Sequence, residues 1–124
     1  PLIYNGQEVG CPVKLPFFSK SPINWTTNPD MFQDYKKLIA LRTSNAAARI
    51  GTLENFSTAD IAAFRRKSGN NEIMVIANVR NMTKTYTLPA SVQNTTWKNA
   101  MTDVNVSLGT SLELKNFEYL ILIK

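Results

Sequence analysis

Histidine is absent from the 124-residue chain, and cysteine occurs once, at Cys11. Without histidine the chain lacks the usual general base of nucleophilic triads and the commonest metal ligand in proteins. A single cysteine excludes an internal disulfide and a cysteine-based zinc cluster, and with no partner base we interpret Cys11 as a small packed residue. Chemistry by this chain would have to use carboxylates, lysine or tyrosine.

Long hydrophobic runs are also missing. No window approaches the roughly 20 apolar residues of a membrane-spanning helix, and no charged-then-apolar signal segment opens the chain. We therefore expect no membrane span. Hydrophobic residues make up 44% of the chain and charged residues 19%, with only 5 glycines and 6 prolines. This composition is typical of one ordinary globular domain, or of one domain plus a fragment of another.

Charge of one sign is not concentrated anywhere along the chain. The 14 basic and 9 acidic residues give a net charge of +5, spread over both halves. The one tight basic run is Arg65, Arg66 and Lys67, which we interpret as the solvated end of a strand. Without a basic stripe or an aromatic-basic recognition motif, we expect no nucleic-acid partner.

The first half of the chain contains one clear helix signal. Asn28 provides a capping side chain, Pro29 fits the first helical position, and Asp30 faces the positive end of the helix dipole. The apolar residues that follow recur at helical spacing, so the sequence predicts an amphipathic helix over 29–44. Asn45 is the expected left-handed stop. The face is formed by Met31, Phe32, Tyr35, Leu38 and Ile39.

After Asn45 the hydrophobic period changes from 3.6 to 2, which predicts a domain boundary near residue 46. Gly69-Asn70-Asn71 predicts a hairpin turn, and the very hydrophobic segment 117–123 should be a central strand because its exposed edge would invite aggregation. We therefore predict a mainly β fold, an antiparallel Greek-key β-sandwich. The expected strands are 50–57, 60–67, 72–80, 84–88, 95–101, 104–107, 110–115 and 117–123.

Few residues of the chain are candidates for catalysis or ligand binding. Glycoside hydrolysis needs two carboxylates facing each other, and the spacing of the nine carboxylates nominates no pair. Glu8 stands out because it follows the apolar segment Pro1–Tyr4, which reads as a short buried strand. The segment Gly6–Gly10 matches no phosphate-binding loop, so we expect no nucleotide cofactor. Trp25 and Trp97 could offer flat faces to sugar rings, although core roles are commoner for isolated aromatic residues.

The first ten residues, Pro1-Leu2-Ile3-Tyr4-Asn5-Gly6-Gln7-Glu8-Val9-Gly10, resemble the eighth barrel strand of the alpha-amylase family, glycoside hydrolase family 13. Residues 21–25 resemble the loop after that strand, and residues 35–42 resemble the last barrel helix of these enzymes. Residues 46–124 resemble the C-terminal antiparallel β-domain of the family by position and pattern. The resemblance implies two parts, with 1–45 as the end of a catalytic (β/α)8 barrel and 46–124 as the β-domain.

The resemblance implies a parent enzyme that hydrolyses α-1,4-glucosidic bonds of starch-like glucans with retention. The family's two catalytic aspartates and its catalytic glutamate follow earlier barrel strands, so we expect this chain to hold no catalytic residue. The calcium sites of the family also lie mostly in earlier segments, and we expect no metal. The resemblance places Glu8 at the active-site end of the barrel, supporting a loop or the site's wall. Tyr4, Trp25 and Trp97 are the further candidates for contacts to the wall or to sugar.

Two functions remain open. The chain is either a catalytically silent support for the barrel of an alpha-amylase-type enzyme or a carbohydrate-binding β-sandwich module that uses Trp97 or strand-face tyrosines. The expected partner is the rest of the barrel, with α-glucan as the ligand of the module alternative and a homodimer of the isolated piece as a further alternative. The resemblance also suggests a bacterial enzyme that is exported or held at the cell surface.

Overall fold

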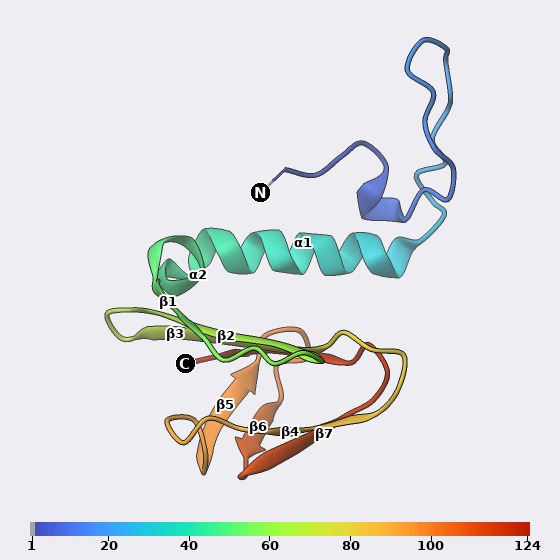
Figure 1. Ribbon diagram of the computed structural model, residues 1–124. Helices are drawn as coiled ribbons and strands as arrows, with labels where there is room; N and C mark the ends of the chain where they lie inside the picture. Colours follow the sequence, from blue (N-terminus) through green and yellow to red (C-terminus); the bar gives the residue numbers. More distant parts are fainter. Residues whose placement is uncertain (1) are drawn as a thin grey trace. The chain divides into compact units, whose positions relative to one another are not determined.

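The computed structural model describes residues 2–124 (Figure 1). The chain divides into two compact units, an N-terminal unit that ends at Ala40 and a C-terminal unit, Leu41–Lys124. These residues form one short 3-10 helix, two α-helices and eight strands. The helical part consists of η1 (Gln7–Val9), α1 (Pro29–Ser44) and α2 (Ala46–Ile50).

Helix α1 has the predicted bounds, and its first turn is capped as expected. The side-chain oxygen of Asn28 accepts a hydrogen bond from the backbone N–H of Met31 at 3.0 Å. The prediction for Asn45 was wrong, because this residue has an extended backbone with φ −97° and caps the start of α2. Its side chain accepts from the backbone N–H of Ala48 at 3.1 Å. A polar side chain that can end one helix can equally begin the next.

All eight predicted strands are present, with ends that differ by a few residues. They form a six-stranded sheet in the order β1-β2-β3-β8-β5-β6 and a two-stranded sheet of β4 and β7, and every pairing is antiparallel. The predicted mainly antiparallel β fold is thus confirmed. The strands are β1 (Thr52–Asn55), β2 (Ile61–Ser68), β3 (Asn71–Asn78), β4 (Lys84–Thr87), β5 (Thr95–Asn99), β6 (Asn105–Leu108), β7 (Ser111–Leu114) and β8 (Tyr119–Ile123).

The centre of the large sheet is formed as the sequence predicts. Strand β8 pairs with β3 on one side and with β5 on the other, so this hydrophobic strand has a neighbour at both of its edges. A two-residue turn connects β2 to β3, with Ser68 opposite Asn71. Gly69 takes the left-handed conformation in this turn, with φ +57°, which a residue without Cβ adopts at no steric cost.

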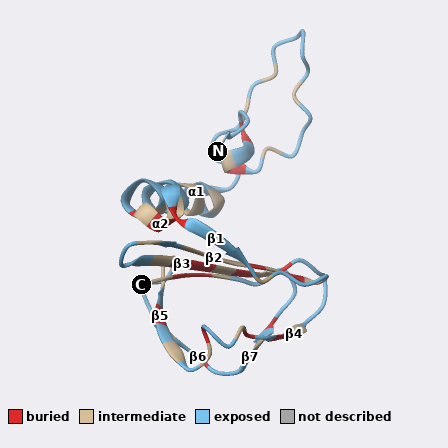
Figure 2. Cartoon of the chain, turned by 60° about the vertical axis from the view of Figure 1, so that its left-hand side comes forward, coloured by how far each residue is buried: buried red, intermediate tan, exposed pale blue. Residues whose placement is uncertain are grey.

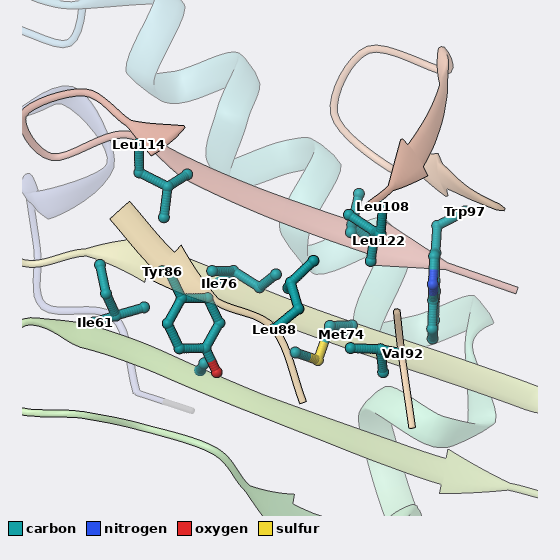
Figure 3. Close-up of a cluster of buried hydrophobic side chains, with 11 residues drawn as sticks. Ile61, Met74, Ile76, Tyr86, Leu88, Val92, Trp97, Leu108, Leu114 and Leu122 are labelled. Atoms are coloured by element: carbon teal, nitrogen blue, oxygen red, sulfur yellow. The ribbon is translucent and has the colours of Figure 1, made fainter. Parts of the chain in front are cut away.

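The two sheets share one hydrophobic core (Figure 3). Alternate residues of β3 and β8 point into this core from the large sheet, and residues of β4 and β7 reach it from the small sheet. This is the two-layer arrangement expected of a β-sandwich. The buried members are Ile61, Ala63, Met74, Ile76, Tyr86, Leu88, Val92, Trp97, Leu108, Leu114 and Leu122.

The other face of the large sheet is covered as well. A second cluster joins Ile73 of β3 and Ile121 of β8 to Ala47 of α2, with Leu41 of α1 among the partly buried residues around it. Figure 2 shows buried residues along the large sheet and at α2. Because β3 contributes to both clusters, its nearly continuous apolar sequence has a direct structural reason.

Asn78, at the end of β3, connects the two sheets through its buried side chain. Its Nδ2 donates to the carbonyl oxygens of Met82, at 2.7 Å, and of Leu114 and Lys115, at 3.1 and 2.8 Å. Its Oδ1 accepts from the backbone N–H of Arg80 at 3.0 Å. One amide therefore donates to carbonyl groups at the end of β7 and in the β3–β4 connection. Without it these carbonyl groups would lose a hydrogen-bond donor.

The basic run lies at the end of β2, as the sequence suggested, but only Lys67 is exposed, whereas Arg65 and Arg66 are partly buried. Arg65 pairs with Glu54 at 2.8 Å and lies 3.6 Å from Glu72, and Lys67 pairs with Glu72 at 3.0 Å. Arg66 donates to the carbonyl oxygens of Ala48 and Gly51 at the end of α2, at 2.7 and 3.1 Å. The carbonyl groups at a helix C-terminus lack intrahelical partners, and a guanidinium satisfies them well.

The strand expected over Pro1–Tyr4 is absent at the residues described here. Leu2, Ile3 and Tyr4 are exposed and form no ladder, and Pro1 lies outside the described residues. A strand requires a neighbouring strand to satisfy its backbone groups. No strand precedes β1 in residues 2–124, so the segment has no partner within this part of the chain.

We expect Asn78→Ala to lower the free energy of unfolding by about 2–4 kcal/mol, because one buried and three partly buried backbone groups lose their partner at once. Urea unfolding followed by tryptophan fluorescence measures this change. Asn116→Ala is the matched control, since the exposed Asn116 makes a single side-chain bond, to Asn81 at 3.2 Å, and should cost less than about 0.5 kcal/mol. Equal losses for the two variants would contradict the role assigned to Asn78.

A second prediction concerns Asp60, which pairs with Lys84 at 2.7 Å and with Arg80 at 2.8 Å. The hydrogen bond from Lys84, together with that from Arg80, lowers the pKa of Asp60 although desolvation opposes the shift. A lowered pKa in the folded state stabilises the fold above the unfolded-state pKa, about 3.9, and this stabilisation is lost as the pH falls through the folded-state value. Asp60→Asn should flatten the loss of stability below about pH 4 in urea titrations. If Asp60→Asn lost as much stability below about pH 4 as the wild type, the stabilising role of these ion pairs would be contradicted.

Candidate functional site

The segment from Tyr4 to Cys11 folds into a compact turn in place of a strand. The backbone N–H of Gln7 donates to the carbonyl oxygen of Tyr4 at 3.0 Å, and the side-chain oxygen of Gln7 accepts from the N–H of Tyr4 at 3.1 Å. The N–H of Cys11 closes the turn by donating to the carbonyl oxygen of Gly6 at 2.9 Å. These bonds hold the 3-10 helix η1 and so fix the position of Glu8.

Two glycines make this turn possible. Gly6 and Gly10 both take left-handed conformations, with φ +86° and +59°. A Cβ atom at Gly6 would lie 3.0 Å from Cβ of Cys11, and one at Gly10 would lie 3.1 Å from the sulfur of Met31 in α1. The spacing of the two glycines therefore serves chain geometry and close approach, as expected where no phosphate loop is present.

A hollow of about 370 Å³ lies between this turn and α1 within the N-terminal unit. Tyr4 and Glu8 line it from the turn, and Tyr35 and Lys36 line it from the helix. One carboxylate oxygen of Glu8, Oε2, is buried and has no hydrogen-bond partner among the described residues. The complete lining is Ile3, Tyr4, Asn5, Glu8, Phe32, Tyr35, Lys36 and Ile39.

A second, more apolar hollow of about 480 Å³ lies on the turn and the following loop. Tyr4 and Phe17 contribute aromatic rings, and Lys14 contributes the one cation of its lining. Phe17 stacks at a tilt on Phe18, with 5.7 Å between ring centroids. Both rings are almost completely exposed, at 90% and 99%. The loop thus presents apolar surface that the N-terminal unit itself leaves uncovered.

The structure brings two of the four predicted site residues together. Tyr4, 63% exposed, and Glu8 line the same hollow, as neighbours in the turn. Trp25 is 53% exposed but lines neither hollow described above. Trp97 belongs to the core of the C-terminal unit and is only 2% exposed.

The suggestion that Trp97 contacts sugar is therefore corrected, because its ring is enclosed. The indole N–H donates to the hydroxyl of Thr95 at 2.7 Å, and the ammonium of Lys124 lies 4.3 Å from the ring centroid. The burial follows from its position on β5, where Trp97 shares the inward-facing side with the buried core residues (Figure 3).

Sequence reasoning missed the helix side of the hollow. The sequence assigned Tyr35 to the apolar face of α1 and gave Lys36 no part in a site. Lys36 follows Phe32 by four residues and so lies on the same helix face, and its ammonium is 5.7 Å from the Phe32 ring centroid. The spacing of four residues between Phe32 and Lys36 is the sequence signal that could have placed Lys36 beside the apolar face of the helix.

The carboxylates do not assemble a catalytic pair in the N-terminal hollow, which holds Glu8 alone. In the C-terminal unit four carboxylates form ion pairs, namely Glu54, Asp60, Glu72 and Asp103. Across residues 2–124, no three side chains of the His, Cys, Asp and Glu types gather in a way that could hold a metal ion. The helices described are too short or too polar to cross a membrane.

Comparison with known proteins gives matches by structure alone. No family model and no curated protein sequence matches the chain. An alpha-amylase from Anoxybacillus, described as a glycosyl hydrolase, is similar with a TM-score of 0.70 and 19% identity over 82% of this chain. The trehalulose synthase of Pseudomonas mesoacidophila MX-45 is similar with a TM-score of 0.62 and 20% identity over 76% of this chain.

The chain spans only a part of these enzymes, 24% of the amylase and 18% of the trehalulose synthase. At this level of identity the likeness concerns the fold. The mainly antiparallel β fold that the sequence resemblance implied agrees with the fold of these neighbours.

We expect Gly6→Ala to loosen the turn that carries Glu8, because the new methyl group requires a strained backbone and meets Cys11. Amide hydrogen exchange at Cys11, whose N–H donates to Gly6, should accelerate by roughly tenfold, the equivalent of about 1.4 kcal/mol. Gly109→Ala is the control, since nothing lies within 4 Å of a Cβ atom there. Unchanged exchange at Cys11 in Gly6→Ala would show that the turn does not depend on this glycine.

Proposed function

We propose that this chain is the end of the catalytic barrel and the following β-domain of a larger glycoside hydrolase of the alpha-amylase type. The proposed substrate of the whole enzyme is a starch-like α-1,4-glucan. The 124 residues themselves carry no catalytic carboxylate in this proposal, and they support the barrel. Structural likeness to an amylase and a trehalulose synthase, each several times longer than the matched segment, supports this reading.

The surface of the N-terminal unit is the observation that carries the proposal. Within its described residues only Gly6 and Val9 are buried, and α1 buries none of its side chains. Most of the unit is exposed or intermediate (Figure 2), and its exposed residues include many large apolar ones, which is unusual for a free-standing domain. Such a surface favours a unit completed by further protein. The exposed residues include Leu2, Ile3, Tyr4, Val13, Phe17, Phe18, Trp25, Phe32, Leu38 and Ile39.

The C-terminal unit differs because it buries its own core between two sheets. It can therefore fold from its own contacts and act as a stable body attached to the last barrel helix. Its carboxylates are largely committed to ion pairs with Arg65, Arg80, Lys84 and other cations. This arrangement favours a stabilising role over a chemical one.

The alternative function, a carbohydrate-binding module, depended on Trp97 or strand-face tyrosines as platforms for a sugar ring. A buried indole offers no open face for stacking, so the support role is favoured. The two functions still make opposite predictions for binding of maltooligosaccharides to the chain alone, and the experiment below includes that measurement.

Removal of residues 46–124 from the complete enzyme should lower its melting temperature and its solubility while leaving the type of bond cleaved unchanged. The physical reason is that the deletion uncovers Leu41 and the end of α1, whereas it removes no catalytic group. Differential scanning calorimetry measures the first effect, and product analysis on amylose measures the second. The proposal also requires that the 124-residue chain alone releases no reducing sugar from amylose.

Two results would count against this function. An unchanged melting temperature in the shortened enzyme would remove the support role. Saturable binding of maltoheptaose to the chain alone, seen by calorimetry, would favour the module, and Trp97→Phe would then test whether the ring is involved while keeping an aromatic residue in the core.

A further inference from the structure

The buried carboxylate oxygen of Glu8 requires a partner that residues 2–124 do not supply. Burial of a polar atom without a hydrogen bond is costly, and such atoms in native proteins are nearly always paired. Oε2 of Glu8 is buried within the N-terminal unit, and no donor of the described chain reaches it. The hydrogen bonds around Gln7 hold the backbone of this turn, from which the Glu8 side chain reaches the hollow.

The surroundings of Glu8 restrict the chemistry of that partner. Lys36 lines the same hollow and already brings one positive charge, and no ion pair joins it to Glu8 among the residues described. A second cation would be repelled by Lys36. An uncharged donor, such as a hydroxyl, an amide or an indole N–H, meets no such opposition and can donate a hydrogen bond to the oxygen.

The shape and polarity of the hollow point to a protein segment as its occupant. Aliphatic side chains of Ile3 and Ile39 and the ring of Phe32 form much of its wall. All three are exposed, so covering them with another apolar surface is favourable. A sugar unit would bring hydroxyl groups on every side and would find aliphatic walls opposite several of them.

We propose that this hollow seats an apolar segment of the catalytic barrel, and that an uncharged hydrogen-bond donor on that segment pairs with Oε2 of Glu8. The inference rests on the proposed function, because the segment belongs to the part of the enzyme that precedes this chain. Glu8 acts here as a positioning residue that fixes the turn against the barrel. It takes no part in bond cleavage.

The test compares Glu8→Gln in two proteins, the complete enzyme and the 124-residue chain. The substitution replaces one of the two carboxylate oxygens by an NH2 group, which donates hydrogen bonds. It also removes the charge, with almost no change in side-chain volume. In the complete enzyme we expect the melting temperature to fall by at least about 2 °C. In the chain alone we expect no loss, because the oxygen has no partner there to lose. Glu113→Gln, at an exposed position of β7, is the matched control and should be silent in both proteins.

Each other outcome overturns the inference in a recognisable way. Equal stability of Glu8→Gln and the wild type in the complete enzyme would show that nothing pairs with Glu8. A loss in the complete enzyme that disappears at high ionic strength would indicate a cationic partner. Dimers of the chain alone that Glu8→Gln dissociates would assign the hollow to a second copy. Absence of any preceding barrel would instead overturn the proposed function, which distinguishes the two failures.

Discussion

Covering the apolar faces of β3 and β8 is the constraint on which the C-terminal unit depends. Met74 and Leu122 enter the core between the sheets, and Ile73 and Ile121 enter the cluster with α2 on the opposite face. These two strands therefore lie at the centre of the six-stranded sheet, where neighbours satisfy both edges. Asn78, at the end of β3 in the large sheet, joins the two layers by donating to the backbone carbonyl of Leu114 in β7 of the small sheet.

The N-terminal unit does not cover its own apolar residues. Its helix α1 has an apolar face of the kind that normally packs on a sheet, yet none of its side chains is buried. The contrast between a unit that covers its own apolar surface and one that leaves it in water is what ties the fold to function. It is the reason for the proposal that further protein covers the N-terminal unit.

Local signals in the sequence predicted most elements because they act over a few residues. The helix was found from its cap and its period, and the strands from alternation and turns. The failures have longer-range causes. Arg66 was misjudged because the carbonyls that it satisfies belong to α2, at residues that precede it by more than ten positions. The strand at Ile3 is missing because a strand depends on neighbours that residues 2–124 do not contain.

The candidate site could be predicted only in part. The run around Glu8 was recognised from its sequence, and the structure places Tyr4 beside it. The helix side of the hollow and the lack of a partner for the buried oxygen depend on how the turn packs on α1, which spacing alone does not give. Trp97 shows the converse, since its type suggested a binding surface whereas its place on β5 made it part of the core.

The most direct measurement is to read the gene upstream of the codon for Pro1. The account predicts an open frame that encodes on the order of 250 residues or more of alternating strands and helices, with aspartate and glutamate at the ends of several strands. A start codon directly before Pro1, with no such region, would contradict it, because the apolar surface of the N-terminal unit would then have no barrel to complete.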